Sequence, residues 1–255
     1  MRHSHVGRRS VLALLAGASL PLGRLSLAPA AAAQVSRTGF IGELDFRVIE
    51  IRGEVRFELV NDFGYIDSTG RRWQAKKGLL TDGASIPSVF WPILGHPFQG
   101  LYLKPAVIHD YYCIPKNRYR KWENVHRVFY DGMLNNGVGR AKALAMYFAV
   151  WRFGPRWSVS EIKPCTPGPN EFCASAQVTE YRVHSEQVTG FDQSQEEARL
   201  REFQALAEAD KIELQDVPGF ESALPALTRT QVTLPVNAIT DEGWFFGNPY
   251  EFPLP

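Results

Sequence analysis

The stretch of sequence on which the rest of the chain depends begins with Thr81-Asp82-Gly83-Ala84-Ser85-Ile86-Pro87 and continues to Asp131. It contains two further motifs, HDYY at residues 109–112 and WENVHRVFYD at residues 122–131. Asp, Ser and His carry most of the acid–base, nucleophilic and metal-binding chemistry of a protein that has no organic cofactor. Their concentration in one short stretch predicts that the fold is arranged to hold these side chains.

The residues before this stretch alternate between apolar and charged side chains over residues 40–77. Segments 44–51 and 54–60 flank Arg52-Gly53 and predict a hairpin, and a second pair, 65–66 and 73–75, flanks a turn sequence. Alternation of this kind predicts an antiparallel sheet with one solvated face. The other face needs an apolar cover, which we expect from the helices that follow.

Three helices are expected after a packed loop over residues 78–100, in which Gly and Pro stand too close together for regular structure. The first helix is expected over residues 105–113 and the third over residues 140–153. The second, over residues 121–136, has a buried stripe at helical spacing that consists of Trp122, Val125, Phe129 and Met133. The predicted fold class is α+β, with a small antiparallel sheet packed against about three helices.

Beyond Trp157 the sequence changes character, and we expect a mixed C-terminal extension that is partly folded. Residues 177–183 alternate like a strand, and Ser194 with Glu197 forms a capping-box sequence for a helix that runs to about Asp210. The predicted organisation is a signal peptide over residues 1–33, an α+β domain over residues 34–157 and an extension over residues 158–255.

The first residues have the pattern of an export signal. Arg8-Arg9 precede an apolar run over residues 11–22, and Ala31-Ala32-Ala33 before Gln34 is a cleavage-site sequence. The adjacent arginines favour the twin-arginine route, and a general secretory signal with incidental arginines is the alternative. Because the run is too short to cross a bilayer, we expect a periplasmic or secreted protein without a transmembrane anchor after cleavage.

The net charge and the cysteine content limit the classes of function that the sequence allows. A net charge of +1 gives no general attraction to nucleic acid. Cys165 and Cys173 bracket a Pro/Gly-rich loop and could close it as a disulfide in an oxidising compartment. Cys113 is then the odd cysteine, and we expect it to be a small buried hydrophobe. Without a CxxC motif, a cysteine-based zinc or redox site is not expected.

His109 and Asp110 are polar residues in an otherwise apolar helix. Burying either without a partner would cost about 1–3 kcal/mol, and more for an ionised group. Either both are structural, with Asp110 bonded to loop N–H groups and His109 to a tyrosine, or His109 is a ligand or base and Asp110 a ligand or orienter. His126 on the next helix supports the functional interpretation. Asp131 lies about 140° round that helix and is expected to be solvated, so Glu123 is the better neighbour of His126.

The loop residues Asp82 and Ser85 each have a structural and a functional interpretation. A carboxylate beside Gly83 most often bonds backbone N–H groups, but Asp82 could also ligate a metal or act as a base. Ser85 lacks the G-x-S-x-G setting of a hydrolase nucleophile, and we expect it to form hydrogen bonds within the loop. A Ser85–His109 hydrolase is the weaker alternative.

The TD-x-ASIP loop, the HD-Y step and the following helix, with a polar residue just before an aromatic one, resemble DUF1353. This is a family of bacterial and phage proteins known by a domain of unknown function. The resemblance covers about residues 40–157 and implies no established activity. In the family the position of His126 is often acidic, so histidine is a departure that exchanges one metal-capable side chain for another.

A catalytic site built from Asp82, His109, Asp110 and His126 would suit Zn²⁺ or another divalent ion, with an open position for water. Such an ion could generate a nucleophile for hydrolysis. No HExxH motif is present, and the long intervals between the ligands make their spacing unspecific. The side chains expected to bind substrate beside it are Ser85, Trp91, Tyr111, Tyr112, Trp122 and Glu123.

Two functions fit these features. The first is an exported, metal-dependent hydrolase that acts on peptidoglycan or another envelope component. The second is a non-catalytic envelope or phage-derived structural or interaction module, in which the same polar residues join loop, helix and sheet. A nucleic-acid binder is not expected, because the sequence has no basic patch.

Overall fold

The computed structural model describes residues 38–51, 54–81, 86–87, 90–95, 100–162 and 180–236, which all lie in one unit of the chain, Ser36–Pro255. The N-terminal strands are β1 (Gly39–Ile41), β2 (Phe46–Ile51), β3 (Glu54–Leu59), β4 (Phe63–Ile66), β5 (Arg72–Ala75) and β6 (Leu80–Thr81). The central helices are α1 (Trp91–Leu94), α2 (Leu103–Cys113), α3 (Trp122–Asn135) and α4 (Arg140–Phe153). The C-terminal elements are β7 (Arg156–Ile162), β8 (Glu180–Gly190), α5 (Gln193–Glu208), α6 (Val217–Ser222) and β9 (Thr228–Val236).

Two small antiparallel sheets form before the helices, where the sequence predicts one. In the first, β3 lies between β2 and β6, and in the second, β4 lies between β1 and β5. Phe63, Tyr65 and Trp73 are buried and share a hydrophobic cluster with Ile108 of α2. The expectation that helices cover the apolar face of the sheet is therefore confirmed, and so is the α+β class.

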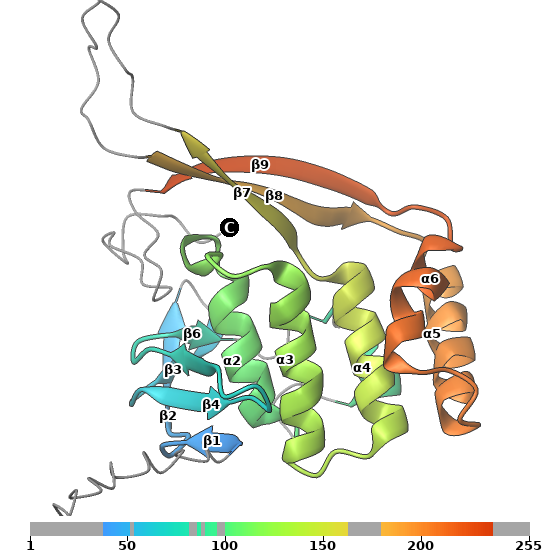
Figure 1. Ribbon diagram of the computed structural model, residues 1–255, viewed down its shortest axis with the longest axis horizontal. Helices are drawn as coiled ribbons and strands as arrows, with labels where there is room; N and C mark the ends of the chain where they lie inside the picture. The colour runs from blue at the N-terminus through green and yellow to red at the C-terminus, as the bar shows by residue number, and fades with distance from the viewer. Residues whose placement is uncertain are drawn as a thin grey trace, which may run out of the picture. The chain divides into compact units, whose positions relative to one another are not determined.

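Helices α2, α3, α4 and α5 stand side by side in a row, with the N-terminal strands next to α2 (Figure 1). Of the stripe predicted for α3, Val125, Phe129 and Met133 are fully buried, and Trp122 is partly buried against the same cluster as Val125. Pro105 lies in the first turn of α2, where its missing N–H leaves no helical hydrogen bond unmade. Within the described residues, none of the helices has the length and apolar character that crossing a bilayer requires.

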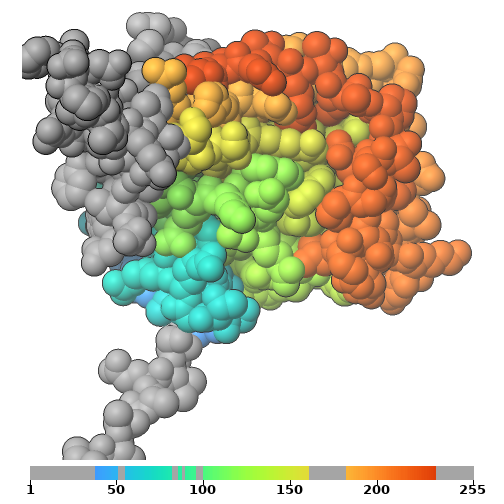
Figure 2. All heavy atoms as spheres, turned by 45° about the horizontal axis from the view of Figure 1, so that its top comes forward, coloured from blue at the N-terminus to red at the C-terminus, as the bar shows by residue number. Residues whose placement is uncertain are grey.

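The elements after Trp157 share a core with the central helices. The Phe203 ring of α5 stacks on the Phe148 ring of α4 with centroids 4.4 Å apart, and β7, β8 and β9 form an antiparallel sheet. In the space-filling view the C-terminal residues in orange and red adjoin the central residues in green and yellow (Figure 2). The domain boundary at residue 157 stays a prediction.

The start of α5 differs from the prediction. Asp192 is the N-cap, and its carboxylate accepts a hydrogen bond from the backbone N–H of Gln195 at 3.0 Å. Ser194 lies inside the helix and donates its hydroxyl to the same carboxylate at 2.7 Å. A capping box of Ser194 and Glu197 is therefore wrong, because Asp192, a residue with equal capping preference, stands at the point where β8 ends.

The turn between β4 and β5 depends on the carboxylate of Asp67. Its Oδ1 accepts bonds from the backbone of Thr69 at 2.9 Å and of Arg71 at 3.0 Å, and its Oδ2 accepts the indole N–H of Trp73 at 2.9 Å. Burial raises the pKa of Asp67, but these hydrogen bonds outweigh it and hold the pKa below its usual 3.8. The ionised carboxylate therefore stabilises the folded state above that pH.

Replacing Asp67 by asparagine should lower the free energy of unfolding at neutral pH by about 1–3 kcal/mol. The amide cannot satisfy the backbone donors and the Trp73 indole together, because its NH₂ group is itself a donor. A group with a depressed folded-state pKa loses its stabilising effect as pH falls. In urea titrations, the deficit of the variant should therefore shrink below about pH 4; a deficit that stays constant down to pH 2 would contradict the role of the charge.

Candidate functional site

Helices α2 and α3 bring His109, Cys113 and His126 together in the interior; these three residues are called the imidazole–thiol cluster below. His109 and Cys113 are one turn apart on the same face of α2, and His126 faces them from α3. His109 Nε2 lies 2.8 Å from His126 Nδ1. The Cys113 sulfur lies 3.6 Å from the same His109 nitrogen.

The cluster is buried among aromatic rings. Both histidines are 0% exposed and Cys113 is 8% exposed. The rings of Phe129 and Trp122 lie 5.1 Å from His109 and 5.3 Å from His126, respectively, measured between centroids. Such a setting excludes water and strengthens any electrostatic interaction inside it.

Asp110 orients His109 from the side opposite His126. Its Oδ1 lies 3.5 Å from His109 Nδ1, and its Oδ2 accepts a hydrogen bond of 2.7 Å from the Thr81 hydroxyl at the end of β6. A carboxylate on one ring nitrogen directs the other toward a partner or metal. Of the two sequence interpretations of Asp110, the geometry matches that of an orienter of His109.

One hydrogen bond joins the two imidazoles, and their pKa values decide which ring donates it. Burial opposes the charge on His109, but Cys113 and Asp110 raise the pKa of His109 to about 10. Burial and the positive His109 lower the pKa of His126 well below its usual value, and the Pro155 backbone opposes this only in part. His109 Nε2 therefore donates to His126 Nδ1. The proton of neutral His126 is then on Nε2, which has no hydrogen-bond partner of normal geometry among the described residues.

Arg118 fixes the Cys113 end of α2. It is 1% exposed, and its Nε and Nη2 donate to the Cys113 carbonyl at 2.9 and 2.6 Å. Its Nη1 donates to the Ser185 hydroxyl in β8. Burial lowers the pKa of Arg118 to about 10. The C-terminal sheet thus contributes to the position of the cluster through one buried guanidinium.

The cluster could hold a metal ion, because one donor atom from each residue lies within 4.8 Å of the others. Tetrahedral zinc, with Zn–N of about 2.0–2.1 Å and Zn–S of about 2.3 Å, requires an N···S edge of about 3.6 Å and an N···N edge of about 3.3 Å. The Cys113–His109 edge of 3.6 Å matches in length, but the Cys113 sulfur also lies 3.7 Å from His109 Nδ1, so the His109 ring must turn before Nε2 and the thiol can reach one ion. The His109–His126 edge of 2.8 Å is the length of a hydrogen bond, so it must lengthen by about 0.5 Å when the shared proton leaves.

The structure brings together three of the four residues predicted to form the metal site, namely His109, Asp110 and His126. Asp82 lies outside the described residues, and so does Ser85. Asp131 pairs with Arg127 at 2.9 Å, and its side chain is 24% exposed, so the expected solvation is only partial.

The aromatic residues predicted to bind substrate are distributed over several places. Trp122 lies against His126. Tyr112 is buried and accepts the backbone N–H of Gln74 at 3.1 Å, and Tyr111 packs edge-on against it. The remaining positions are Trp91 on α1, whose indole donates to the Ile86 carbonyl at 3.2 Å, and the exposed Glu123 in the first turn of α3. Their roles as substrate ligands stay predictions.

Cys113 is the member of the cluster that sequence reasoning missed. Its burial is confirmed, but its contact with the His109 ring was not foreseen. The signal was the His-x-x-x-Cys spacing, which places both side chains on one helical face. The predicted Cys165–Cys173 disulfide lies outside the described residues.

Comparison with known proteins supports the family resemblance. The model of the family DUF1353, described as a protein of unknown function, matches residues 57–150, a shorter range than the motifs implied. An uncharacterized protein of Sinorhizobium fredii, y4iH, is 42% identical over 127 residues, which are 49% of this chain and 52% of the relative. A second from the same organism, y4jT, is 43% identical over 160 residues, 61% of this chain and 46% of the relative.

The chain therefore spans about half the length of these curated relatives. No solved structure matches it. The matched range contains every residue of the imidazole–thiol cluster.

Proposed function

We propose that this chain, which carries a DUF1353 segment at residues 57–150, binds a divalent ion of the zinc class and is a metal-dependent hydrolase of cell-envelope material. The observation that carries the proposal is the convergence of two imidazoles and one thiol with an N···S distance of 3.6 Å. Imidazole and thiolate together favour zinc over magnesium or calcium, which prefer oxygen ligands.

The three donors correspond to the ligand number of catalytic zinc sites, which use three protein ligands and leave a fourth position for water or substrate. When bound there, the ion would lower the pKa of a water molecule and supply a nucleophile. The protein's own residues would contribute to the site in three other ways. Asp110 holds the tautomer of His109, Arg118 fixes the helix end at Cys113, and the aromatic rings keep bulk water away.

The envelope assignment rests on the export pattern at residues 8–33. A protein exported by the twin-arginine route crosses the membrane folded, and a buried metal site is compatible with loading before export. Peptidoglycan is the proposed partner, and the periplasm or the exterior is the proposed location.

A non-catalytic envelope module is the second candidate, and the burial of the cluster favours it. With both histidines at 0% exposure and a hydrogen bond of 2.8 Å between their rings, the pair satisfies part of its own polarity. In that case the cluster connects α2 with α3 and no substrate reaches it.

The full chain, purified with its native metal content, separates these candidates. We expect about one equivalent of zinc per chain and release of soluble fragments from isolated peptidoglycan, lost after chelation and restored by zinc. The matched control is His184→Gln, which alters an exposed histidine of β8 outside the cluster. Bound zinc without activity on peptidoglycan would support the structural module, and a chain that binds no divalent ion would overturn the metal proposal altogether.

A further inference from the structure

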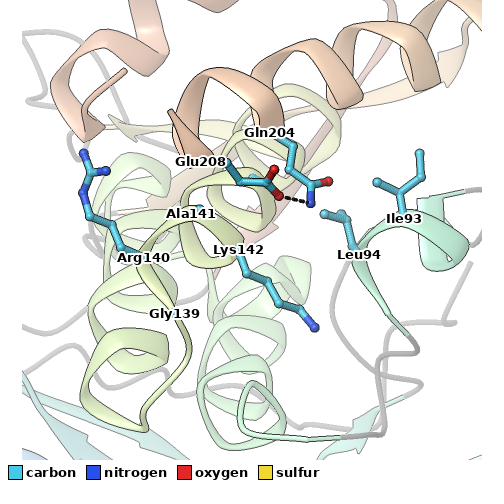
Figure 3. A pocket seen from close by; sticks show the side chains of 9 residues that line it. Ile93, Leu94, Gly139, Arg140, Ala141, Lys142, Gln204 and Glu208 are labelled. Atoms are coloured by element: carbon cyan, nitrogen blue, oxygen red, sulfur yellow. Dashed lines mark hydrogen bonds between the residues drawn. The ribbon is translucent and has the colours of Figure 1, made fainter. Parts of the chain in front are cut away.

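A pocket of about 400 Å³ lies between α1, α4 and α5 (Figure 3). This volume is within the range of small-molecule sites. Its apolar part comes from Leu94, Ala141 and Ala145, and its polar side chains include Lys142 and Glu208. None of its lining residues belongs to the imidazole–thiol cluster.

The pocket is at the opposite end of α4 from the cluster. Its lining uses the first turns of α4, up to Ala145, whereas a Cβ added at Gly154, the C-cap of α4, would lie 3.0 Å from His126 Nε2. Ala145 and Gly154 are nine positions apart, which corresponds to about 14 Å along a helix. The pocket is therefore a separate place in the fold.

The α4 side of the pocket carries positive charge on the exposed side chain of Lys142, which no carboxylate of the same helical turn offsets. The N-cap Gly139 gives no side-chain hydrogen bond, and the first turn of α4 contains no acidic residue. Lys142 lies in this turn with its ammonium 5.0 Å from the centroid of the Tyr102 ring, and it forms no ion pair with a described residue. Arg140, by contrast, is paired with Asp210 and Glu213, each at 2.7 Å. A lysine at a helix N-terminus is electrostatically unfavourable, because the helix dipole places partial positive charge there.

The α5 side carries the opposite charge in the same way. Glu208 is the last residue of α5, and the last turn of that helix contains no basic residue. Its carboxylate accepts the amide of Gln204 at 2.9 Å (Figure 3) and pairs with no cation in the part of the chain that the structure describes. A carboxylate at the negative end of a helix is again unfavourable.

We propose that this pocket binds a small zwitterion with an aliphatic body, a free amino acid or a short peptide. The positive end of α4 with Lys142 receives the carboxylate, and Glu208 at the negative end of α5 receives the ammonium group. The aliphatic body lies on Leu94, Ala141 and Ala145. A zwitterion removes both unfavourable charges at once, which neither a simple anion nor a simple cation can do.

Titration calorimetry of the full chain with L-leucine and with L-alanyl-L-alanine tests this site. We expect saturable binding in the millimolar range or tighter, and at least about a tenfold loss when the probe is N-acetylated or esterified. Lys142→Met and Glu208→Gln should each weaken binding of the unmodified probe by a similar factor. Glu202→Gln, an exposed position of α5 outside the pocket lining, is the matched control and should bind normally.

Three results would overturn the proposal. They are absence of heat with both probes up to about 10 mM, equal affinity for blocked and free probes, and binding that Lys142→Met and Glu208→Gln leave unchanged. Binding that depends on the carboxylate and on Lys142 alone would also count against it, because it would reduce the pocket to an anion site at the start of α4.

Discussion

Replacing Glu196 by alanine is expected to lower the free energy of unfolding by about 3–5 kcal/mol. Glu196 of α5 is 2% exposed and Arg152 of α4 is 0% exposed. The two form a bidentate pair, with Arg152 Nε and Nη2 donating to the two carboxylate oxygens at 2.5 and 2.7 Å. A second carboxylate, that of Glu221, lies 3.5 Å from Arg152, and Glu196 also pairs with Arg199. Removal of Glu196 therefore leaves a guanidinium in the core with most of its charge uncompensated.

Urea denaturation at neutral pH measures this loss of stability, and two further variants serve as controls. Glu197→Ala, one residue along the same helix, removes a carboxylate whose only described ion pair is a 3.9 Å contact with Arg201, so it should change stability by less than about 1 kcal/mol. The double variant Arg152→Met/Glu196→Met should recover much of the loss, because an apolar pair needs no charge compensation. If Glu196→Ala were no more destabilising than Glu197→Ala, the buried pair would not stabilise the packing of α5 on α4.

The sequence predicts well the elements whose signals are local, and less well the features that depend on residues far away in the chain. The helix over residues 140–153 agrees with α4 (Arg140–Phe153), because helical periodicity and a following Gly-Pro are local signals. The sequence does not predict the strand β7 (Arg156–Ile162), since the evidence for it lies in its pairing with β8, from Ile162 with Glu180 to Arg156 with Glu186. Arg152 and Glu196 stand 44 positions apart in the sequence, so their pairing has no local signature at all.

Likewise, only part of the candidate site could be predicted from the sequence. That His109 and Asp110 need partners follows from two polar residues in an apolar helix, and the structure supplies those partners in His126 and Thr81. Which nitrogen faces which atom depends on the crossing of α2 and α3, and no pattern within either helix gives it. By its residue type, Cys113 is expected to be a buried hydrophobe, but its position one turn from His109 is the more informative fact.

Substituting Cys113 by serine is expected to reduce zinc affinity by at least about 100-fold, since it removes the soft donor from a site that otherwise offers two imidazoles. Serine is close in size to cysteine but places a hydroxyl in a buried site, so the metal-free variant should be about 1–3 kcal/mol less stable than the metal-free wild type. The Sγ–Nε2 distance of 3.6 Å also leads to a spectroscopic prediction. Cobalt-loaded wild type should show a sulfur-to-cobalt charge-transfer band that Cys113→Ser lacks.

The double variant Cys165→Ser/Cys173→Ser controls for the other two thiols of the chain, and it should keep both the zinc affinity and the cobalt band. His109→Gln should lose metal as Cys113→Ser does, because both remove one of the three donors. If the serine variant bound zinc as tightly as the wild type while His109→Gln did not, the thiol would be a packing neighbour of the imidazole and not a ligand. The third ligand would then have to be an oxygen donor, and the preference for zinc over harder cations would disappear with the sulfur.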